Sequence, residues 1–234
     1  MKFLAIIPAR EGSEGLKNKN FKKLGGKPLI EYTINAAKKS KYLDKFLVST
    51  NDKKIINYCK KNKVNFIIRP KGLCLSNSKT IDAINHTLDI LKKKGYIPDF
   101  IVTLQPTSPF RNYKHVDNAI KLFKNNLSAD SLVSCQKIPH KFNPDSSYIL
   151  KKNSSLKKFI SNNENIFIRQ KKNKFFARNG AAIYITKIKH IKKFIFGKRI
   201  LGYEMDEISS IDIDNLYDFR FAEFILKFSK TYEQ

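Results

Sequence analysis

The sequence has little cysteine and no long apolar run. Its three cysteines, Cys59, Cys74 and Cys135, are odd in number and widely spaced. This pattern argues against a disulfide framework or a cysteine-based structural zinc site and favours a reducing, cytoplasmic environment. No apolar run approaches the roughly 20 residues that a membrane-spanning helix needs. The apolar run that precedes Arg10 and Glu11 is also too short for a secretory signal peptide, so we expect no membrane partner.

Acidic residues and arginine are scarce, and this decides how the charge is interpreted. Lys and Arg together number 46 against 20 Asp and Glu, so the net charge is +26 at pH 7. Such a charge is typical of nucleic-acid-binding proteins. However, only seven of the basic residues are Arg, the side chain best suited to phosphates and bases, and the other 39 are Lys spread through every segment. We therefore expect a solvated, lysine-rich surface without a nucleic-acid partner, whose field favours an anionic small-molecule substrate.

Apolar runs alternate with helical patterns along the 234 residues, which suit a single domain covering 1–234. Short apolar runs predict strands at Phe3–Ile7, Phe46–Thr50, Phe66–Ile68, Phe100–Leu104 (a central strand), Ser131–Cys135, Ala181–Ile185 and Ser210–Ile213. Apolar steps of three and four predict helices at Ile30–Lys39, from a cap at Asn51-Asp52 to Lys61, after Ser78 or Thr80 as cap, at Val116–Phe123 and at Leu216–Lys227. Repeated strand–helix units predict an α/β fold with a doubly wound, mostly parallel sheet.

The stretch 137–174 interrupts this alternation with polar sequence rich in Lys, Asn and Ser. Two short apolar patches, Tyr148–Leu150 and Ile166–Ile168, lie on either side of the turn residues Asn162 and Asn163. A disordered insert and a projecting hairpin both fit this composition. The strand-like patches favour the hairpin.

The first strand opens directly onto a polar loop. The loop carries glycines, a hydroxyl, cations and an amide: Arg10, Gly12, Ser13, Gly15, Lys17, Lys19 and Asn20. At the carboxyl end of an α/β sheet, glycines let the backbone approach a phosphorylated ligand and cations offset its charge. The spacing matches neither GxGxxG nor GxxxxGK[ST], so neither a Rossmann dinucleotide site nor a P-loop is supported. A polar turn with incidental lysines is the alternative; the scarce Arg10 at the strand end favours a ligand site.

Two further patterns follow apolar segments. LQPTSPFR, residues 104–111, contains Gln105, whose amide can read a base edge or another amide. A proline-stiffened turn explains this pattern equally well. In SIDID, Asp212 and Asp214 are two residues apart on an extended segment, so both can face one hard cation such as Mg²⁺. Capping of the following helix by Asp214 is the alternative.

The segment FARNGAAIY, residues 176–184, contains a turn that enters a strand. Arg178 in this turn fits a carboxylate-binding role or a simple loop. His86, His115 and His190 fit surface or packing roles, and only His140 lies in an irregular segment. No Ser/His/Asp set and no metal-binding Cys/His spacing is present in the sequence.

Together these motifs resemble the acylneuraminate cytidylyltransferase family, the CMP-sialic acid synthetases and their relatives that act on legionaminic and pseudaminic acids. The resemblance runs from Phe3 to about Ile225. Its motifs occur in the family's order: IPAR-x-GS-x-G at 7–15, Lys19-Asn20, LGGKPLI-x-YTI at 24–34, VSTND at 48–52, Arg69-Pro70, LQPTSPFR, RNGAAIYI and SIDID. One such motif would be weak evidence, whereas the ordered set is strong.

The resemblance implies transfer of CMP from CTP to the anomeric hydroxyl of a nine-carbon 2-keto-3-deoxy sugar acid, with Mg²⁺ required and pyrophosphate released, to activate the sugar for surface glycan synthesis. The residues that match nucleotide-binding positions are Arg10, Ser13, Lys19, Asn20 and Arg69, of which Arg10 and Lys19 would stabilise charge on the phosphates. Those that match sugar-acid positions are Gln105, Arg169, Gln170 and Arg178, and Asp212 and Asp214 match the metal-binding pair.

The resemblance also implies a homodimer in which the insert 137–174 is a dimerisation hairpin that reaches the partner's active site. In one place the chain departs from the family. Members often have SKGLPxKN where this chain has SEGLKNKN, so Glu14 replaces a Lys and Lys17 replaces a Pro. The loop keeps its cations but shifts one of them.

Three other interpretations remain open. A glycosyltransferase could use Asp212 and Asp214 as its DxD pair, although that pair usually falls in the middle of the chain. A basic protein that binds nucleic acid would show steeply salt-dependent binding without nucleotide turnover. A catalytically silent relative would keep the acidic pair only as a helix cap.

Overall fold

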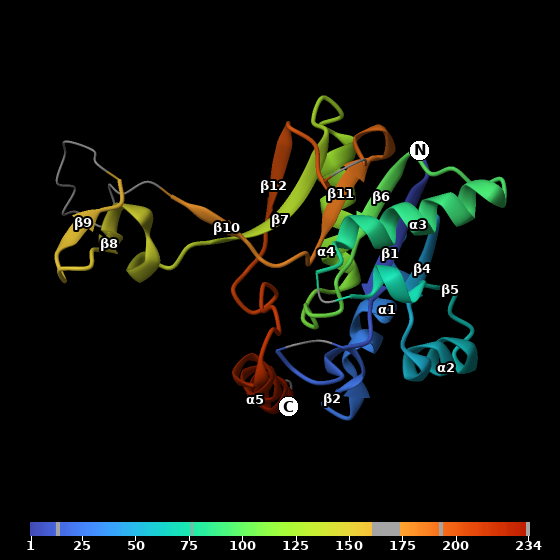
Figure 1. Ribbon diagram of the computed structural model, residues 1–234, viewed down its shortest axis with the longest axis horizontal. Helices are drawn as coiled ribbons and strands as arrows, with labels where there is room; N and C mark the ends of the chain where they lie inside the picture. Colours follow the sequence, from blue (N-terminus) through green and yellow to red (C-terminus); the bar gives the residue numbers. More distant parts are fainter. Residues whose placement is uncertain (13–14, 76, 161–173, 192–193, 233–234) are drawn as a thin grey trace.

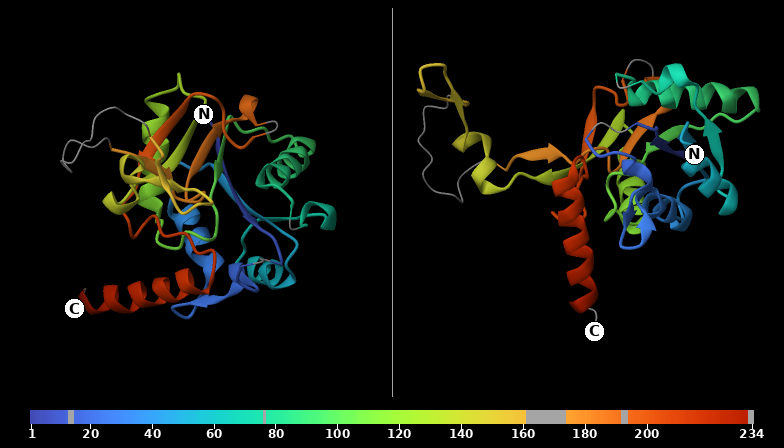
Figure 2. Two further views of the ribbon diagram at one scale, coloured as in Figure 1. Left: turned by 60° about the vertical axis from the view of Figure 1, so that its left-hand side comes forward. Right: turned by 60° about the horizontal axis from the view of Figure 1, so that its bottom comes forward.

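The computed structural model describes residues 1–12, 15–75, 77–160, 174–191 and 194–232, and the side chains of this part up to Phe228. A central sheet with helices on both faces forms the body (Figure 1). A narrow arm, whose described part comprises residues 137–160, and the last helix project from this body in different directions (Figure 2).

Eight described strands form the central sheet, in the order β10-β7-β11-β6-β1-β4-β5, with β12 also paired to β7. They are β1 (Phe3–Ala9), β4 (Lys45–Thr50), β5 (Phe66–Ile68), β6 (Phe100–Thr103), β7 (Ser131–Lys137), β10 (Phe176–Arg178), β11 (Tyr184–Lys187) and β12 (Ile200–Glu204). Pairing is parallel from β6 through β1 and β4 to β5, and between β12 and β7. Only β10 and β11 run antiparallel to their neighbours. The mostly parallel α/β fold is therefore confirmed.

Helices cover both faces of the sheet because β1 is apolar on both. The long helices are α1 (Leu29–Lys39), α2 (Lys53–Lys61), α3 (Thr80–Lys93), α4 (Tyr113–Lys124) and α5 (Leu216–Tyr232). Alternate β1 side chains point to opposite faces: Phe3, Ala5 and Ile7 join the buried cluster that contains residues of α1, α2 and α4. Leu4 and Ile6 join a second cluster with α3. The chain is thus doubly wound, as predicted.

Helix starts follow local side-chain chemistry. The Asp52 side chain accepts a hydrogen bond from the Lys54 backbone N–H at the start of α2, as predicted. The predicted cap of α3 was wrong: Lys79 occupies the N-cap, and the Asp82 carboxylate accepts from its N–H at 3.0 Å. The helix α5 is also capped by a residue other than Asp214. The Asn215 side chain accepts from the Asp218 N–H at 3.0 Å.

The predicted position of the last strand of the sheet, Ser210–Ile213, was wrong. SIDID does not form a strand; Ile211 and Ile213 instead pack with residues of α5 and of β2 (Lys23–Leu24), a short strand that pairs with β3 (Lys27–Pro28). The alternation of Ile and Asp along this loop imitates the strand period. The last strand is β12, which the sequence did not reveal because it is a half-exposed segment beside β7. The strand predicted at Ala181–Ile185 begins three residues later and runs from Tyr184 to Lys187.

The arm contains a short antiparallel hairpin that stands away from the body (Figures 1 and 2). In it β8 (Tyr148–Leu150) pairs with β9 (Leu156–Lys158), a strand that the sequence did not predict. The patch Ile166–Ile168, expected as the second strand, lies outside the described residues, as do Asn162 and Asn163. Short 3-10 helices, Lys19–Phe21, Lys71–Leu73, His140–Phe142, Pro144–Ser146 and Ile188–His190, lie among the described loops. No helix in the described part is long and apolar enough to cross a membrane.

Candidate active site

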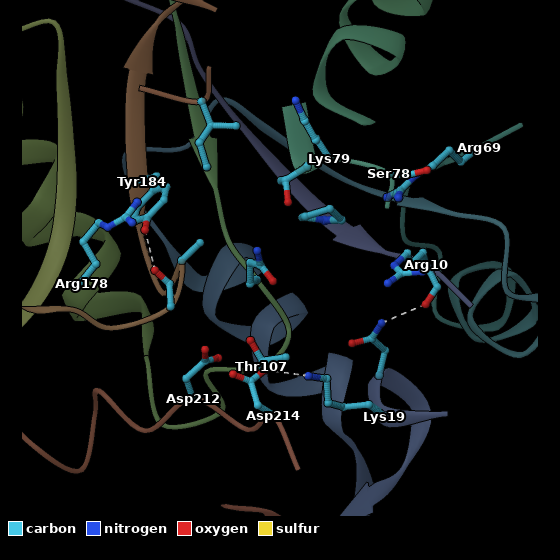
Figure 3. Close-up of a pocket in the computed structure, with 17 residues that line it drawn as sticks. Arg10, Lys19, Arg69, Ser78, Lys79, Thr107, Arg178, Tyr184, Asp212 and Asp214 are labelled. Carbon is cyan, nitrogen blue, oxygen red and sulfur yellow. Dashed lines mark hydrogen bonds and ion pairs between the residues drawn. The ribbon is translucent and has the colours of Figure 1, made fainter. Parts of the chain in front are cut away.

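A cavity of about 400 Å³ opens at the carboxyl ends of β1, β5 and β6 (Figure 3). It forms there because the polar residues after each parallel strand emerge at the same edge of the sheet. Eight predicted site residues line it: Arg10, Lys19, Asn20, Arg69, Gln105, Arg178, Asp212 and Asp214. Residues up to 204 positions apart in the sequence therefore meet at one place. The other three, Ser13, Arg169 and Gln170, lie outside the described residues.

Arg10 and Asn20 hold the opening loop against its neighbours. The Arg10 guanidinium donates to the backbone oxygens of Leu75 at 3.1 Å and Cys74 at 3.4 Å. The buried Asn20 side chain donates to the Arg10 backbone oxygen at 3.1 Å. The loop that follows β1 is thus tied both to itself and to the segment after β5. Lys17, one of the two departures from the family pattern, is exposed, and the other, Glu14, lies outside the described residues.

Arg69 is buried at the end of β5 and is anchored to β4. Its Nε donates to the Ser49 hydroxyl at 3.2 Å and its Nη2 to the Ser49 backbone oxygen at 2.8 Å. Burial lowers the pKa of the Arg69 guanidinium, and the nearby Arg10 charge lowers it further. This arrangement fixes a second cation in the cavity wall (Figure 3).

Lys19 connects the opening loop to the acidic pair. Its Nζ lies 3.0 Å from Asp214 Oδ1; the Lys19 side chain is 13% exposed and that of Asp214 72%. In this state the lysine charge is balanced by Asp214, so a ligand phosphate at Lys19 would compete with that carboxylate. Since Asn215 caps α5, the interpretation of Asp214 as the cap of this helix is wrong. Its side chain instead faces the cavity.

Asp212 differs from Asp214 in its surroundings. Its Oδ1 is buried and has no hydrogen-bond partner among the described residues. Burial raises the pKa of the Asp212 carboxyl, and interaction with the Thr107 side chain opposes this rise. Gly180 lies against the carboxyl group: a Cβ at Gly180 would stand 2.6 Å from Asp212 Cγ. A buried oxygen without a partner needs one to offset its lost hydration.

These features fit a divalent cation. Asp212 and Asp214 both line the cavity, and carboxylates are oxygen ligands of the kind that Mg²⁺ prefers. No group of three or more potential metal-binding side chains exists in the part of the chain that the structure describes. A pair of carboxylates is nevertheless sufficient when substrate phosphates complete the coordination. The site therefore suits a metal that arrives with a nucleotide.

Arg178 and Tyr184 lie in the wall away from Arg10 and Arg69 (Figure 3), and Ile195 also lines the cavity. The Tyr184 hydroxyl donates to the Gly180 backbone oxygen at 2.7 Å, and the Arg178 guanidinium lies 5.4 Å from the centre of the Phe196 ring. Stacking of this kind orients a guanidinium while it keeps its charge. The wall thus offers a cation next to apolar surface, suited to a carboxylate on a larger organic ligand.

Sequence reasoning did not assign a site role to several lining residues. Lys79 lines the cavity at the start of α3, where the sequence suggested only a cap. Thr107 and Tyr184 lie within motifs that were recognised, so motif membership was the available signal. Ile195 comes from a Lys-rich stretch without a motif, and only the tertiary structure places it at the site.

Known proteins share both this sequence and this architecture. Residues 4–231 match the family described as cytidylyltransferase. The chain is 34% identical over 229 residues to N-acylneuraminate cytidylyltransferase of Escherichia coli O18:K1:H7, which covers 94% of this chain and 51% of that protein. It is 30% identical to CMP-N,N'-diacetyllegionaminic acid synthase of Legionella pneumophila over 98% of each chain. It therefore spans about half of the first relative and nearly all of the second.

A solved structure of CMP:2-keto-3-deoxy-manno-octonic acid synthetase complexed with CTP has the same fold. The TM-score is 0.72 with 14% identity, over 98% of this chain and 100% of that chain. At this identity the likeness concerns the fold alone. The family match, in contrast, includes every described residue of the cavity. The chain therefore belongs to the cytidylyltransferase family.

Proposed function

We propose that this chain transfers CMP from CTP to the anomeric hydroxyl of a sialic-acid-like, nine-carbon 2-keto-3-deoxy sugar acid and releases pyrophosphate. The observation that carries the proposal is the cavity itself, in which Arg10, Arg69 and Lys19 face the Asp212–Asp214 pair. Cations suit the phosphates, and the carboxylates suit Mg²⁺. The names of the two relatives, which act on N-acylneuraminate and on diacetyllegionaminic acid, support the substrate class.

In this reaction the sugar hydroxyl attacks the α-phosphorus of CTP in line with the leaving pyrophosphate. A new O–P bond forms, the P–O bond to pyrophosphate breaks and the hydroxyl proton is released. Positioning and charge neutralisation supply most of the acceleration in such a displacement. Arg10 and Lys19 hold the phosphates, and Gln105 and Arg178 orient the base or the sugar acid at the other wall.

Asp212 and Asp214 would hold Mg²⁺. When bound, the ion supplies positive charge to the phosphate oxygens. The buried, unpartnered Oδ1 of Asp212 supports this role because it lacks any other described ligand. The Lys19–Asp214 ion pair would loosen as the phosphates take Lys19 and the metal takes Asp214.

The most direct test incubates the purified protein with CTP, Mg²⁺ and a panel of sialic, legionaminic and pseudaminic acids. We expect pyrophosphate release with at least one of them. If no acid releases pyrophosphate, the proposal loses its main support. Pyrophosphate also separates this reaction from glycosyl transfer, which does not produce it from CTP.

A change of Asp212 to Asn tests the metal assignment. We expect turnover to fall by about a hundredfold or more, because a metal clamp on phosphates contributes several kcal/mol to the transition state. The exposed Asp89 on α3 provides the matched control, and Asp89→Asn should keep full activity. Full activity of Asp212→Asn would refute the assigned role.

We further propose that two copies associate through the arm. Its described hairpin exposes Tyr148, Ile149, Leu150, Leu156 and Phe159, each at least 50% exposed. The arm also carries six lysines against one acidic residue over 137–160, whereas 204–223, next to the active site, contains seven of the chain's 20 acidic residues and one arginine. Opposite charge favours contact between these surfaces on different copies.

The homodimer is testable by light scattering across a concentration series. We expect Leu150→Asp combined with Leu156→Asp to shift the protein to monomer, because charges would enter an apolar contact. The control is Ile97→Asp, which alters an apolar residue on the body that is also more than half exposed. An unchanged mass for the arm variant would contradict the proposal.

We also propose that the enzyme is cytoplasmic, which its unpaired cysteines support.

A further inference from the structure

Arg111, the last residue of LQPTSPFR, is a buried cation without a carboxylate partner in the described structure. Its side chain is 1% exposed, and no described ion pair includes it. Burial lowers the pKa of its guanidinium to about 9. Removing a cation from water without a counter-charge is costly. The hydrogen bonds that Arg111 donates must therefore offset this cost.

Those hydrogen bonds join three separate elements. Arg111 Nη1 donates to the backbone oxygens of Gln105 at 3.1 Å and Ala182 at 2.8 Å, and Nη2 donates to the Thr33 hydroxyl at 2.5 Å. Thr33 in turn donates to the Gln105 oxygen at 3.3 Å. The guanidinium thus fastens the loop after β6 to the turn before β11 and to helix α1. Its planar fork suits this task, because several donors are held in one rigid plane.

Both segments that Arg111 holds also contact the acidic pair. In the loop after β6, the Thr107 backbone oxygen accepts from the Ile213 N–H at 2.8 Å, and Ile213 lies between Asp212 and Asp214. In the turn before β11, Gly180 lies against the Asp212 carboxyl group. The Gln105 N–H donates to the Ala181 oxygen at 3.0 Å and closes the connection between the two segments.

We propose that Arg111 is a positioning residue for the Asp212–Asp214 pair: through the Gln105 and Ala182 backbone it fixes the two surfaces against which Asp212 is held. The inference rests on the proposed function, in which that pair binds Mg²⁺ with CTP. Groups that orient metal-binding side chains change metal affinity or activity by about 10–100-fold when removed. Arg111 itself touches no reacting atom in this scheme.

The experiment measures the dissociation constant of CTP by calorimetry, once with Mg²⁺ and once with EDTA, in the absence of a sugar acid. The ratio of the two constants reports the contribution of Mg²⁺ to CTP binding. Arg111→Lys keeps the charge but loses the planar fork of donors. Thr33→Val keeps the side chain's shape and removes two bonds of the network, the one accepted from Arg111 and the one donated to the Gln105 oxygen. Thr87→Val is the matched control, because Thr87 is also fully buried and its hydroxyl bonds only within α3, to the Ala83 oxygen.

We expect the Mg²⁺ contribution to fall about tenfold or more in Arg111→Lys and by a smaller factor, about threefold or more, in Thr33→Val. Thr87→Val should keep the wild-type ratio even if its melting temperature falls as far as that of Thr33→Val. A purely structural role for Arg111 would lower melting temperatures and leave the ratio unchanged in all three variants, and this result would overturn the inference. If Arg111→Lys does not fold, Thr33→Val against Thr87→Val decides. Failure of the wild-type protein to bind CTP would instead refute the proposed function.

Discussion

At the scale of single residues, the geometry of the Asp212–Asp214 pair depends on a glycine, Gly180, as well as on the two carboxylates. Gly180 has φ +65°, in the left-handed region that glycine adopts most easily, and its Cα faces the Asp212 carboxyl group. Two independent constraints therefore exclude a side chain at this position. The turn in RNGAAIY suggests the first constraint, whereas the second cannot be read from the motif because Asp212 is 32 residues away in the sequence.

The change Gly180→Ala should separate these two constraints. Gly26 also has a positive φ, +84°, but a Cβ there would meet nothing within 4 Å. We expect Gly26→Ala and Gly180→Ala to lose comparable stability, about 1–2 kcal/mol, from the backbone conformation. Only Gly180→Ala should also lose Mg²⁺-dependent turnover, by about tenfold or more, because its methyl group displaces Asp212. Thermal unfolding and the pyrophosphate assay measure the two effects, and equal turnover in both variants would contradict this account.

At the scale of elements, the segment between β11 and β12 supplies Ile195 to the cavity and is fastened at its ends by Asp130. The Asp130 carboxylate accepts from the Arg199 N–H at 3.0 Å and lies 3.2 Å from His190 Nε2. The hydrogen bond from the Arg199 backbone is the largest of the interactions that hold the pKa of Asp130 below its usual value. A wall of the active site therefore depends on a buried carboxylate outside it.

The sign of this pKa shift predicts a pH dependence. A carboxyl group whose pKa is lowered by folding stabilises the protein above its unfolded-state pKa, and this stabilisation is lost as the pH falls through the folded-state value. Asp130→Asn should therefore melt several degrees below the wild type at pH 7. The difference should shrink as the pH falls below the ordinary Asp pKa of about 4 and on through the lowered pKa of folded Asp130. Melting curves at both pH values measure this, and a gap independent of pH would argue against the anchoring role; Asp89→Asn is the exposed control.

At the scale of the whole molecule, the charge of +26 acts as a diffuse field. It favours the approach of anions in general, from small phosphorylated or carboxylated molecules to polyanions. The acidic residues are unevenly placed: seven of 20 fall in 204–223, at the site and beside it. The molecule thus has a local negative region within a positive surface, which is consistent with metal binding at one place and anion attraction elsewhere.

Any binding to DNA should consequently be non-specific. We expect the affinity for a short duplex to fall by about a hundredfold or more between 50 and 200 mM salt and to show no preference for sequence. Arg10→Ala should weaken CTP binding and leave the DNA affinity nearly unchanged, because one of 46 basic residues is lost. Fluorescence anisotropy with two unrelated duplexes measures this. A strong preference for one duplex at 200 mM salt would restore the nucleic-acid interpretation.

The sequence by itself determined the α/β class, most of the strands and helices, and eight of the residues that meet at the cavity. This was possible because buried strands and amphipathic helices carry their periodicity locally, and because polar residues at the ends of parallel strands share one edge of the sheet. The helix α2 runs from its Asp52 cap to Lys61 as predicted, and the strand β1 begins at Phe3 as predicted but continues past Ile7 to Ala9.

Only the tertiary structure decided where SIDID lies, that β12 pairs with β7 in the sheet, and that Lys19 pairs with Asp214. It also decided that Asn215 rather than Asp214 caps α5, and that Arg111 lies buried beneath the site. Each of these outcomes depends on contacts between segments that are distant in the chain. The same alternation of Ile and Asp serves a strand or a packed loop, and the partner that packs against it makes the choice.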